Sequence, residues 1–239
     1  MDKIVSLAKR RGFIFPGSEI YGGLSGTWDY GPLGTILKNI VTWEWRRRFV
    51  FSRDDMFLIE SAILMNRRVW EASGHVESFV DPMVDCRSCK SRLRADQVDP
   101  TKPCPVCGAH DFTDIRPFNT MFKTYVGPVE NTAAETYLRP ETAQGMFVNF
   151  KNVLDTLHPK LPFGIAQVGK AFRNEITPGN FIFRVRELEQ MEIEYFIRSG
   201  EWERWFEYWL GEMRAWIAFL GLAAANVHER EVPKKDRAH

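Results

Sequence analysis

FRVRELEQMEIEYFI, residues 183–197, is the stretch of sequence that decides the fold. Its composition permits a helix as well as a strand, so the periodicity has to decide. At a period of two, one face is mostly apolar and is interrupted only by Glu187 and Glu189. The other face carries Arg184, Arg186, Leu188, Gln190, Glu192 and Glu194. That much charge cannot face a closed core unpaired, so the pattern predicts a strand packed on helices on one side and lining a polar cleft on the other. A solvated sheet face or an amphipathic helix is the alternative that the pattern leaves open.

The segment before this stretch predicts its hairpin partner. Phe163–Phe172 is a second strand-like run, and Phe181–Ile197 is the return strand. Between them, residues 173–180 end in the turn formers Pro178, Gly179 and Asn180. We therefore expect an antiparallel hairpin with a long loop.

Helical patterns surround the hairpin. Apolar residues recur at three and four positions after Pro32, at Leu33, Ile36, Leu37, Ile40, Val41, Trp45 and Phe49. A second helix is predicted to start at Pro140, since proline suits the first helical position, and to bury Met146, Phe147, Phe150, Val153, Leu154 and Leu157. A third runs from Trp202 to Leu220 with an aromatic stripe that favours core packing. Met56–Leu64 is expected to be a strand and Trp70–Phe79 a connecting segment, which makes the fold class α+β.

The composition is that of a globular protein without a strong charge bias. Of 239 residues, 44% are hydrophobic, and 32 basic residues nearly balance 31 acidic ones, so any contact with RNA must use local patches. The apolar run Ile217–Val227 is shorter than the about 20 residues that cross a bilayer. Met1–Phe15 lacks the continuous apolar core of a signal peptide. We expect a cytoplasmic protein with no membrane segment.

All four cysteines lie in two pairs, Cys86-x2-Cys89 and Cys104-x2-Cys107, separated by fourteen residues. Each pair can chelate one side of a tetrahedral ion, and four sulfur ligands indicate a closed, structural Zn²⁺ site. The surrounding segment Cys86–Gly108 is dense in Cys, Pro and basic residues and is typical of a small inserted module. Reduced cysteines left by a decayed site are the alternative. A redox CxxC is disfavoured because two matched pairs occur together.

Several strings resemble a known family. Arg173 with Glu175, followed by Arg184 and Glu192 on the return strand, resembles motif 2 of class II aminoacyl-tRNA synthetases, and the helix from Gly31-Pro32-Leu33-Gly34 resembles motif 1. The string RPETAQGMFVNF at residues 139–150 is similar to a signature of the dimeric glycyl enzymes, and the likeness covers nearly the whole chain.

The resemblance implies a fold and a domain division. It implies an antiparallel sheet flanked by helices, with a zinc-ribbon-like insertion. Residues 1–80 would be the first part of the catalytic domain, residues 81–116 the insertion and residues 117–239 the second part.

The resemblance also implies an activity: ATP-dependent activation of glycine with Mg²⁺, and transfer of glycine to tRNA(Gly), by a homodimer. Arg173 would be the catalytic arginine. The other implied nucleotide-binding residues are Asn174, Glu175, Phe183, Arg184, Val185, Arg186, Glu187 and Leu188. The implied substrate-binding residues are Arg94, Glu141, Leu188, Glu189, Gln190, Met191 and Glu192.

Three features depart from the family pattern. Leu188 stands where a phenylalanine usually stacks on adenine, and Arg67 stands where motif 1 often has a proline. The sequence also ends at Lys234–His239 without motif 3, the glycine-rich helix whose arginine holds the far end of ATP, and without an anticodon-binding domain. We therefore expect a chain with an incomplete site. An inert synthetase-like module that binds RNA or a partner is the alternative, and Arg173, Glu175, Glu141 and Glu192 argue against it.

Overall fold

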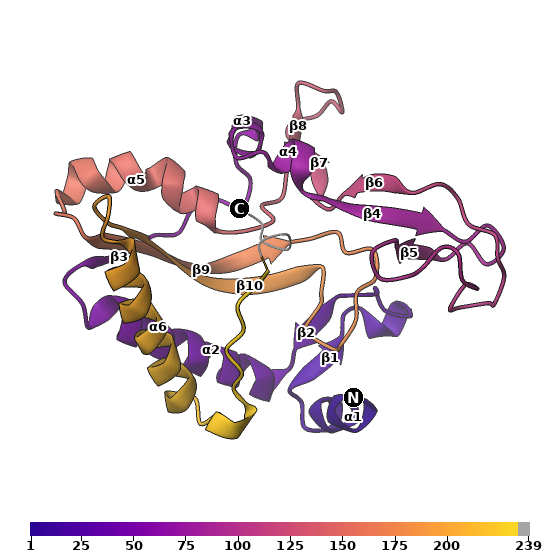
Figure 1. Ribbon diagram of the computed structural model, residues 1–239, viewed down its shortest axis with the longest axis horizontal. Coiled ribbons are helices and arrows are strands. Elements are labelled where there is room, and N and C mark those ends of the chain that lie inside the picture. The colour runs from indigo at the N-terminus through magenta and orange to yellow at the C-terminus, as the bar shows by residue number, and fades with distance from the viewer. Residues whose placement is uncertain (234–239) are drawn as a thin grey trace. The chain divides into compact units, whose positions relative to one another are not determined.

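The computed structural model describes residues 1–233 and separates the chain into two compact units, Met1–Tyr195 and Phe196–His239. The described structure is α+β with several small sheets (Figure 1). The chain end at Lys234–His239, on which the expectation of a missing motif 3 rests, lies outside the described residues.

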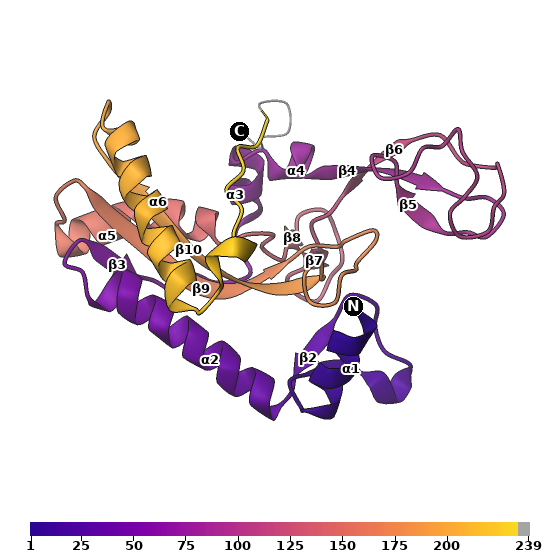
Figure 2. The ribbon, with the colours of Figure 1, turned by 60° about the horizontal axis from the view of Figure 1, so that its bottom comes forward.

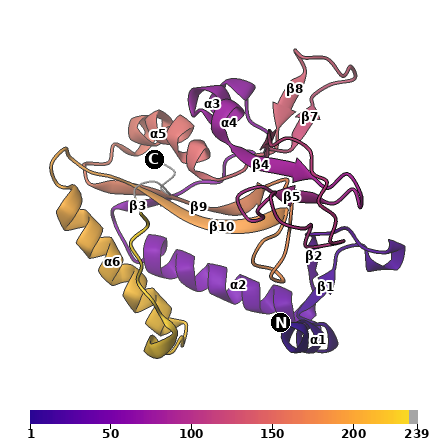
Figure 3. The same ribbon diagram turned by 45° about the vertical axis from the view of Figure 1, so that its right-hand side comes forward.

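The central sheet has the order β10-β9-β3, formed by Glu187–Phe196, Phe163–Phe172 and Met56–Leu58 (Figure 1). The first five residues of β9 are all buried, as expected of a strand covered on both faces. Helix α5 (Ala143–Leu157) lies on one face of this sheet and helix α2 (Pro32–Arg46) on the other (Figures 1 and 3).

Two details of this sheet differ from the sequence prediction. β3 pairs with β9 in parallel, with Met56 opposite Gly164, whereas an antiparallel sheet was expected. A parallel pair needs a long crossover, which the segment between the two strands provides. β10 also begins at Glu187 rather than Phe181, because Asn180 and Phe181 adopt positive φ angles of 54° and 59° and turn the chain.

The amino-terminal region holds α2 in place. Helix α1 (Asp2–Arg10) precedes the hairpin of β1 (Ile14–Pro16) and β2 (Trp28–Tyr30), which carries the turn η1 (Glu19–Tyr21). α2 starts with Pro32 at its first position, as predicted, and continues as the π-helix η2 (Arg47–Phe51). Gly34 is required here, because a Cβ would lie 1.9 Å from the carbonyl oxygen of Phe13.

Two short helices replace the connecting segment expected at Trp70–Phe79. These are α3 (Arg67–Ala72) and α4 (His75–Ser78). The Asn66 side chain accepts a hydrogen bond of 3.0 Å from the Arg68 amide and caps α3. Arg67, where a proline was expected, donates to Glu71 at 2.7 Å and to Glu135 at 3.1 Å, which ties α3 to strand β8 (Glu135–Tyr137).

The inserted module contains the three-stranded antiparallel sheet β5-β4-β6 (Figure 2). Its strands are Val80–Asp85 (β4), Arg92–Arg94 (β5) and Arg116–Asn119 (β6). After it, β7 (Lys123–Tyr125) pairs with β8, and the chain then enters α5.

Helix α5 starts at Ala143, three residues later than predicted. The backbone before it is engaged in tertiary hydrogen bonds: the Pro140 carbonyl accepts from Arg173, and the Thr142 amide donates to Gln190. Of its predicted apolar stripe, Met146 and Val153 are buried, whereas Phe147, Leu154 and Leu157 are exposed.

The second unit contains helix α6 (Trp202–Phe219), as predicted, and the turn η3 (Ala224–Asn226). The aromatic stripe of α6 is less buried than expected, since Trp216 is buried but Trp202 and Phe206 are exposed. Arg214 and Glu229 form a bidentate ion pair inside this unit. Across residues 1–233, the helices are too short or too polar to cross a membrane.

Candidate functional site

The RPETAQG segment is anchored beside the end of β9 by its first residue. Arg139 is almost fully buried, and its side chain donates to the carbonyl oxygens of Lys170 at 2.6 Å and Ser61 at 2.9 Å. Its own carbonyl accepts from the Phe172 amide at 2.9 Å. Burial lowers the pKa of Arg139. Its backbone partners are uncharged, so they do not oppose this lowering with a charge of their own. The anchor fixes the three residues that follow it against the sheet.

Those residues meet the polar face of β10. The Thr142 amide donates to Gln190 Oε1 at 3.1 Å, and the Thr142 hydroxyl donates to Glu192. The alternation predicted for this strand is therefore present, with Gln190 and Glu192 on the side of α5. Thr142, just ahead of α5, uses an amide that has no partner within the helix.

Glu141 is held by two donors on one of its oxygens. Its Oε1 lies 3.2 Å from His75 Nε2 and accepts from Gln144 Nε2 at 2.7 Å. The hydrogen bond with His75 is the main cause that lowers the pKa of Glu141; burial opposes it, and Gln144 and the charge of Arg173 add to the lowering. Glu141 is therefore an ionised carboxylate at neutral pH.

Glu194 lies on the same face of β10, and its pKa is shifted in the opposite direction to that of Glu141. Burial, together with the charges of Glu192 and Glu141, raises its pKa to about 7. Three acidic side chains from two segments thus face one small region. Such a region favours a cation.

Arg173 lies next to this acidic group. Its Nε donates to the Pro140 carbonyl at 3.1 Å, and its guanidinium carbon is 5.6 Å from the centre of the Phe79 ring. These contacts hold one edge of the planar guanidinium group. The guanidinium places a fixed positive charge beside Glu141, as the effect on the pKa of Glu141 indicates.

The loop after β9 borders a cavity on the side of the insertion. The cavity has a volume of about 460 Å³ and is lined by Met83, Arg92, Arg116, Pro117, Phe118, Asn174, Glu175, Ile176 and Arg186. Arg186 donates to the Glu175 carbonyl at 3.0 Å and fixes this loop. Glu175 Oε2 is buried and accepts no hydrogen bond from the described residues. It is an acceptor that a ligand could satisfy.

The other expected nucleotide-binding residues lie along the return arm. Val185 is buried, Arg184 and Leu188 are half-buried, and Phe183 is 83% exposed. Gly179 and Arg184 exchange backbone hydrogen bonds of 3.0 and 3.1 Å, which closes the tip of the loop.

Arg94 lies in the insertion and is engaged by neighbouring acids. It donates to Asp81 at 2.5 Å and to Asp96 at 2.8 Å. The hydrogen bond that Arg94 donates to Asp96 is the main cause that raises the pKa of Arg94, and Glu175 contributes through its charge. Arg94 is thus already paired with two acids of the insertion.

Part of the expected set lies on the other face of β10. Glu189 forms an ion pair of 2.5 Å with Lys38 of α2, and Glu187 pairs with Lys170 of β9. Met191 lines an apolar cavity of about 410 Å³ together with residues of α1 and α2. These three side chains point away from Glu141 because successive residues of a strand alternate between its faces.

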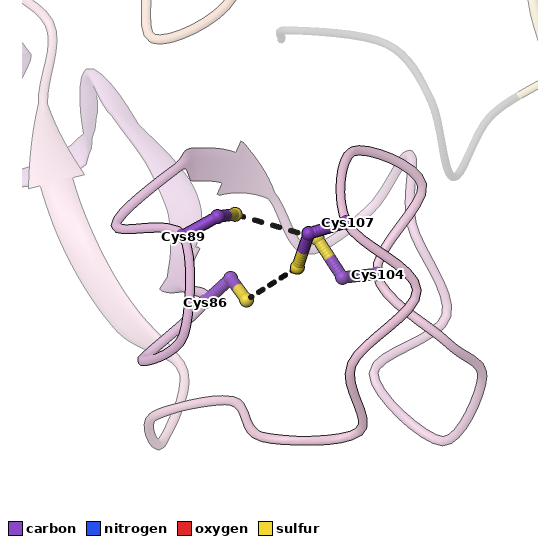
Figure 4. A group of neighbouring side chains, drawn as sticks. All are labelled: Cys86, Cys89, Cys104 and Cys107. Carbon is purple, nitrogen blue, oxygen red and sulfur yellow. Dashed lines mark hydrogen bonds between the residues drawn. The ribbon is translucent and has the colours of Figure 1, made fainter.

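The four cysteines converge in the insertion (Figure 4). Their sulfur atoms all lie within 4.8 Å of one another, with Cys86 to Cys107 at 3.6 Å and Cys89 to Cys104 at 3.9 Å. A tetrahedral Zn²⁺ with Zn–S bonds of about 2.3 Å requires sulfur atoms about 3.8 Å apart. The donor set and its spacing therefore fit zinc.

The two knuckles are built alike. The Lys90 amide donates to the Cys86 carbonyl at 2.9 Å, and the Gly108 amide donates to the Cys104 carbonyl at 2.8 Å. Lys90 and Gly108 both adopt positive φ angles, 62° and 77°. Hydrogen bonds with Ser91 lower the pKa of the Cys89 thiol to about 6, so one sulfur of the cluster is readily available as a thiolate ligand.

No protein-family model matches the chain. Curated relatives named glycine–tRNA ligase align with 100% of it: the protein of Caldanaerobacter subterraneus subsp. tengcongensis is 53% identical, and those of Geobacillus kaustophilus and Thermobifida fusca are 51% identical. The chain is homologous to part of glycine–tRNA ligase. It spans 58% of the length of the first two relatives and 55% of the third.

A solved structure shares the fold of this glycine–tRNA ligase homologue. It is titled as the RNA binding domain of threonyl-tRNA synthetase from Cryptosporidium parvum, and it superposes with a TM-score of 0.60 over 90% of this chain and 42% of that chain. At 18% identity it shows the fold alone.

Four residues of the acidic region were not among the predicted site residues: His75, Thr142, Gln144 and Glu194. Glu194 could have been found by continuing the period-two pattern from Gln190 and Glu192. Gln144 lies three positions after Glu141, a spacing at which side chains meet around a helical turn. No local pattern linked His75 to Glu141, because the two residues lie in distant segments of the chain.

Proposed function

We propose that this chain carries the glycine-binding region and one wall of the ATP-binding region of a glycine–tRNA ligase. The observation that carries the proposal is the juxtaposition of Glu141, Glu192 and Arg173 around residues 140–142. Glycine offers only an ammonium, a carboxylate and two hydrogens, so charge pairing and steric exclusion must select it. Glu141 and Glu192 pair with the ammonium, and Gln190 supports the wall behind it.

Activation forms a bond between a glycine carboxylate oxygen and the α-phosphorus of ATP and breaks the bond to the pyrophosphate group, which leaves glycyl-adenylate. The carboxylate needs no base, since its pKa of about 3.3 to 3.7 keeps it ionised. Catalysis therefore rests on alignment and on neutralising phosphate charge. Arg173, held by its Nε, presents its remaining nitrogens to the α-phosphate and glycine carboxylate oxygens. Mg²⁺ supplies further positive charge at the phosphates.

The adenine side is assigned to the loop after β9. The buried Glu175 Oε2, without a donor among the described residues, accepts a hydrogen bond from the adenine amino group. Leu188 packs against the base with less planar contact than a phenylalanine would give. Arg94 is assigned to the substrate side with a less direct role, since Asp81 and Asp96 already pair with it.

The cysteine cluster holds a structural Zn²⁺ through Cys86, Cys89, Cys104 and Cys107. The module has few large apolar residues, and its core cluster consists of Val84, Cys86, Leu93 and Cys104. Metal binding therefore contributes to folding rather than to chemistry.

The complete protein acts as a homodimer on tRNA(Gly). Helix α2 supports this, because one of its faces is apolar and exposed: Leu33, Ile36, Leu37, Ile40 and Trp43 are each 46–56% exposed. Contiguous exposed apolar surface of this kind marks an interaction site.

The test is glycine-dependent exchange of pyrophosphate into ATP by a version of the chain extended through motif 3. We expect exchange with glycine and a loss of about 10²- to 10³-fold in Arg173→Ala, the usual cost of removing a preorganised charge contact. Arg214→Ala, in an ion pair of the second unit, serves as the matched control and should keep its activity. Activation of another amino acid, or full activity of Arg173→Ala, would contradict the assignment. An extended protein that binds RNA but activates no amino acid would favour the inert module.

A further inference from the structure

We infer that His75 is a positioning residue of the ammonium site, which orients Glu141 so that a single carboxylate oxygen faces the ligand. The inference rests on the proposed function and assigns a role to a residue that takes no direct part in it. The two carboxylate oxygens of Glu141 differ in the hydrogen bonds that they accept.

Both hydrogen bonds to Glu141 fall on Oε1, from His75 Nε2 and Gln144 Nε2. Among the described residues, Oε2 accepts none of the hydrogen bonds observed. A carboxylate has about four lone-pair sites, so Oε2 retains its full capacity to accept from an ammonium. Two donors on Oε1 also fix the plane of the carboxylate, which removes rotational freedom that binding would otherwise have to restrict.

His75 is itself rigidly held. Its side chain is 91% buried, and its ring lies between Trp70, at a centroid distance of 5.5 Å, and Phe79, at 5.2 Å. Asn119 donates to the backbone carbonyl of His75 at 3.2 Å and to that of Val76 at 2.9 Å. The ring therefore cannot turn away from Glu141 without disturbing a packed cluster.

Ser73 sets the tautomer of His75. Its hydroxyl lies 2.9 Å from His75 Nδ1 and 3.4 Å from the Trp70 carbonyl. Because the ionised carboxylate of Glu141 can only accept, its contact with Nε2 requires the ring proton on Nε2, and in the neutral ring Nδ1 then accepts from the Ser73 hydroxyl. Ser73 thus donates to His75, and His75 donates to the Glu141 carboxylate that binds the ligand.

The matched variants are His75→Phe and His75→Gln. Phenylalanine keeps an aromatic ring between Trp70 and Phe79 but has no donor, whereas glutamine places an amide donor near the position of Nε2. We expect glycine to bind about tenfold more weakly to His75→Phe, the cost of losing one hydrogen bond to a charged group, and His75→Gln to recover most of that loss. ATP affinity should stay unchanged in both. Glycine and ATP affinities are measured by NMR titration of the 239-residue chain.

A second measurement does not depend on glycine. Ring ¹⁵N spectra of the chain, which has five histidines, should show His75 as the neutral Nε2–H tautomer, and Ser73→Ala should add the Nδ1–H form. The signal of His75 is assigned by its disappearance in His75→Gln. A merely structural histidine would not respond to Ser73→Ala in this way.

The outcomes separate the two proposals. If the unaltered chain binds glycine and a folded His75→Phe binds it equally well, His75 has no positioning role, although the proposed function stands. If His75→Phe does not fold, an Nδ1–H tautomer of His75 in the unaltered chain overturns the inference, because Nε2 could not then donate to Glu141. If the unaltered chain binds no glycine, the proposed function fails, and the role of His75 at an ammonium site fails with it.

Discussion

The carboxylates of the acidic region differ because their partners differ. Glu141 has two hydrogen-bond donors and a nearby arginine, and its pKa is lowered. Glu194, on the strand that faces it, is desolvated and lies near two other acids, and its pKa is raised to about 7. One group is thus ionised at neutral pH, while the other titrates much closer to neutrality. Binding of an ammonium would favour the ionised form of both.

Glu194→Gln tests this difference through stability. Because the folded-state pKa of Glu194 is raised from 4.5 to about 7, its contribution to stability is present below pH 4.5 and is lost as the pH rises through about 7. The free energy of unfolding of Glu194→Gln relative to the unaltered chain should therefore increase between pH 5 and 8. Urea denaturation at both pH values measures it. Glu203→Gln, at an exposed position of α6, is the control, and a difference that does not change with pH would contradict the predicted titration.

At the scale of elements, the insertion depends on its metal. We expect about one zinc per chain by elemental analysis, since four thiolates provide one closed tetrahedral site. We expect the segment between β4 and β6 to become sensitive to protease when the zinc is removed with a chelator, and also in Cys104→Ser. In both cases the small core of the module loses the metal ion that holds it together. Ser88→Ala, an exposed position between the first two cysteines, should change neither result. A metal-free chain with a protease-resistant insertion would disprove the zinc assignment.

Helix α2 presents the other element-scale prediction. Its exposed apolar face should make the chain self-associate in a concentration-dependent way, which light scattering detects. The double substitution Ile36→Glu and Ile40→Glu should reduce the association, since a charge in an apolar interface is costly to bury. Ile20→Glu offers a matched control, because Ile20 is 86% exposed in η1 and lies outside α2. A monodisperse monomer of the unaltered chain would show that this face has no partner.

For the whole molecule, the chain alone should bind glycine and ATP weakly and activate glycine near background. It spans little more than half the length of its relatives, and under the proposed function its described residues would form one wall of the nucleotide site. Each preorganised charge contact that the rest of such a protein would add commonly contributes about 10²- to 10³-fold in rate. Pyrophosphate exchange by the chain and by the version extended through motif 3 makes the comparison. Robust exchange by the chain alone would show that the missing contacts are not needed.

Local patterns in the sequence determined several parts of this protein. The apolar repeat after Pro32 defines α2, the period-two pattern defines the two faces of β10, and the paired CxxC spacing brings four sulfurs together. In the helix and the strand the side chains repeat at a fixed period, and within each CxxC pair the two sulfurs are close in the chain, so local geometry constrains them.

Only the tertiary structure decided the remaining features. β3 joins β9 in parallel, α5 starts late because Arg173 and Gln190 take up the backbone before it, and His75 reaches Glu141 from another segment. These contacts join residues far apart in sequence, and no local period encodes them. Their pairing depends on how the packed elements bring buried donors to buried acceptors, which is a property of the folded chain as a whole.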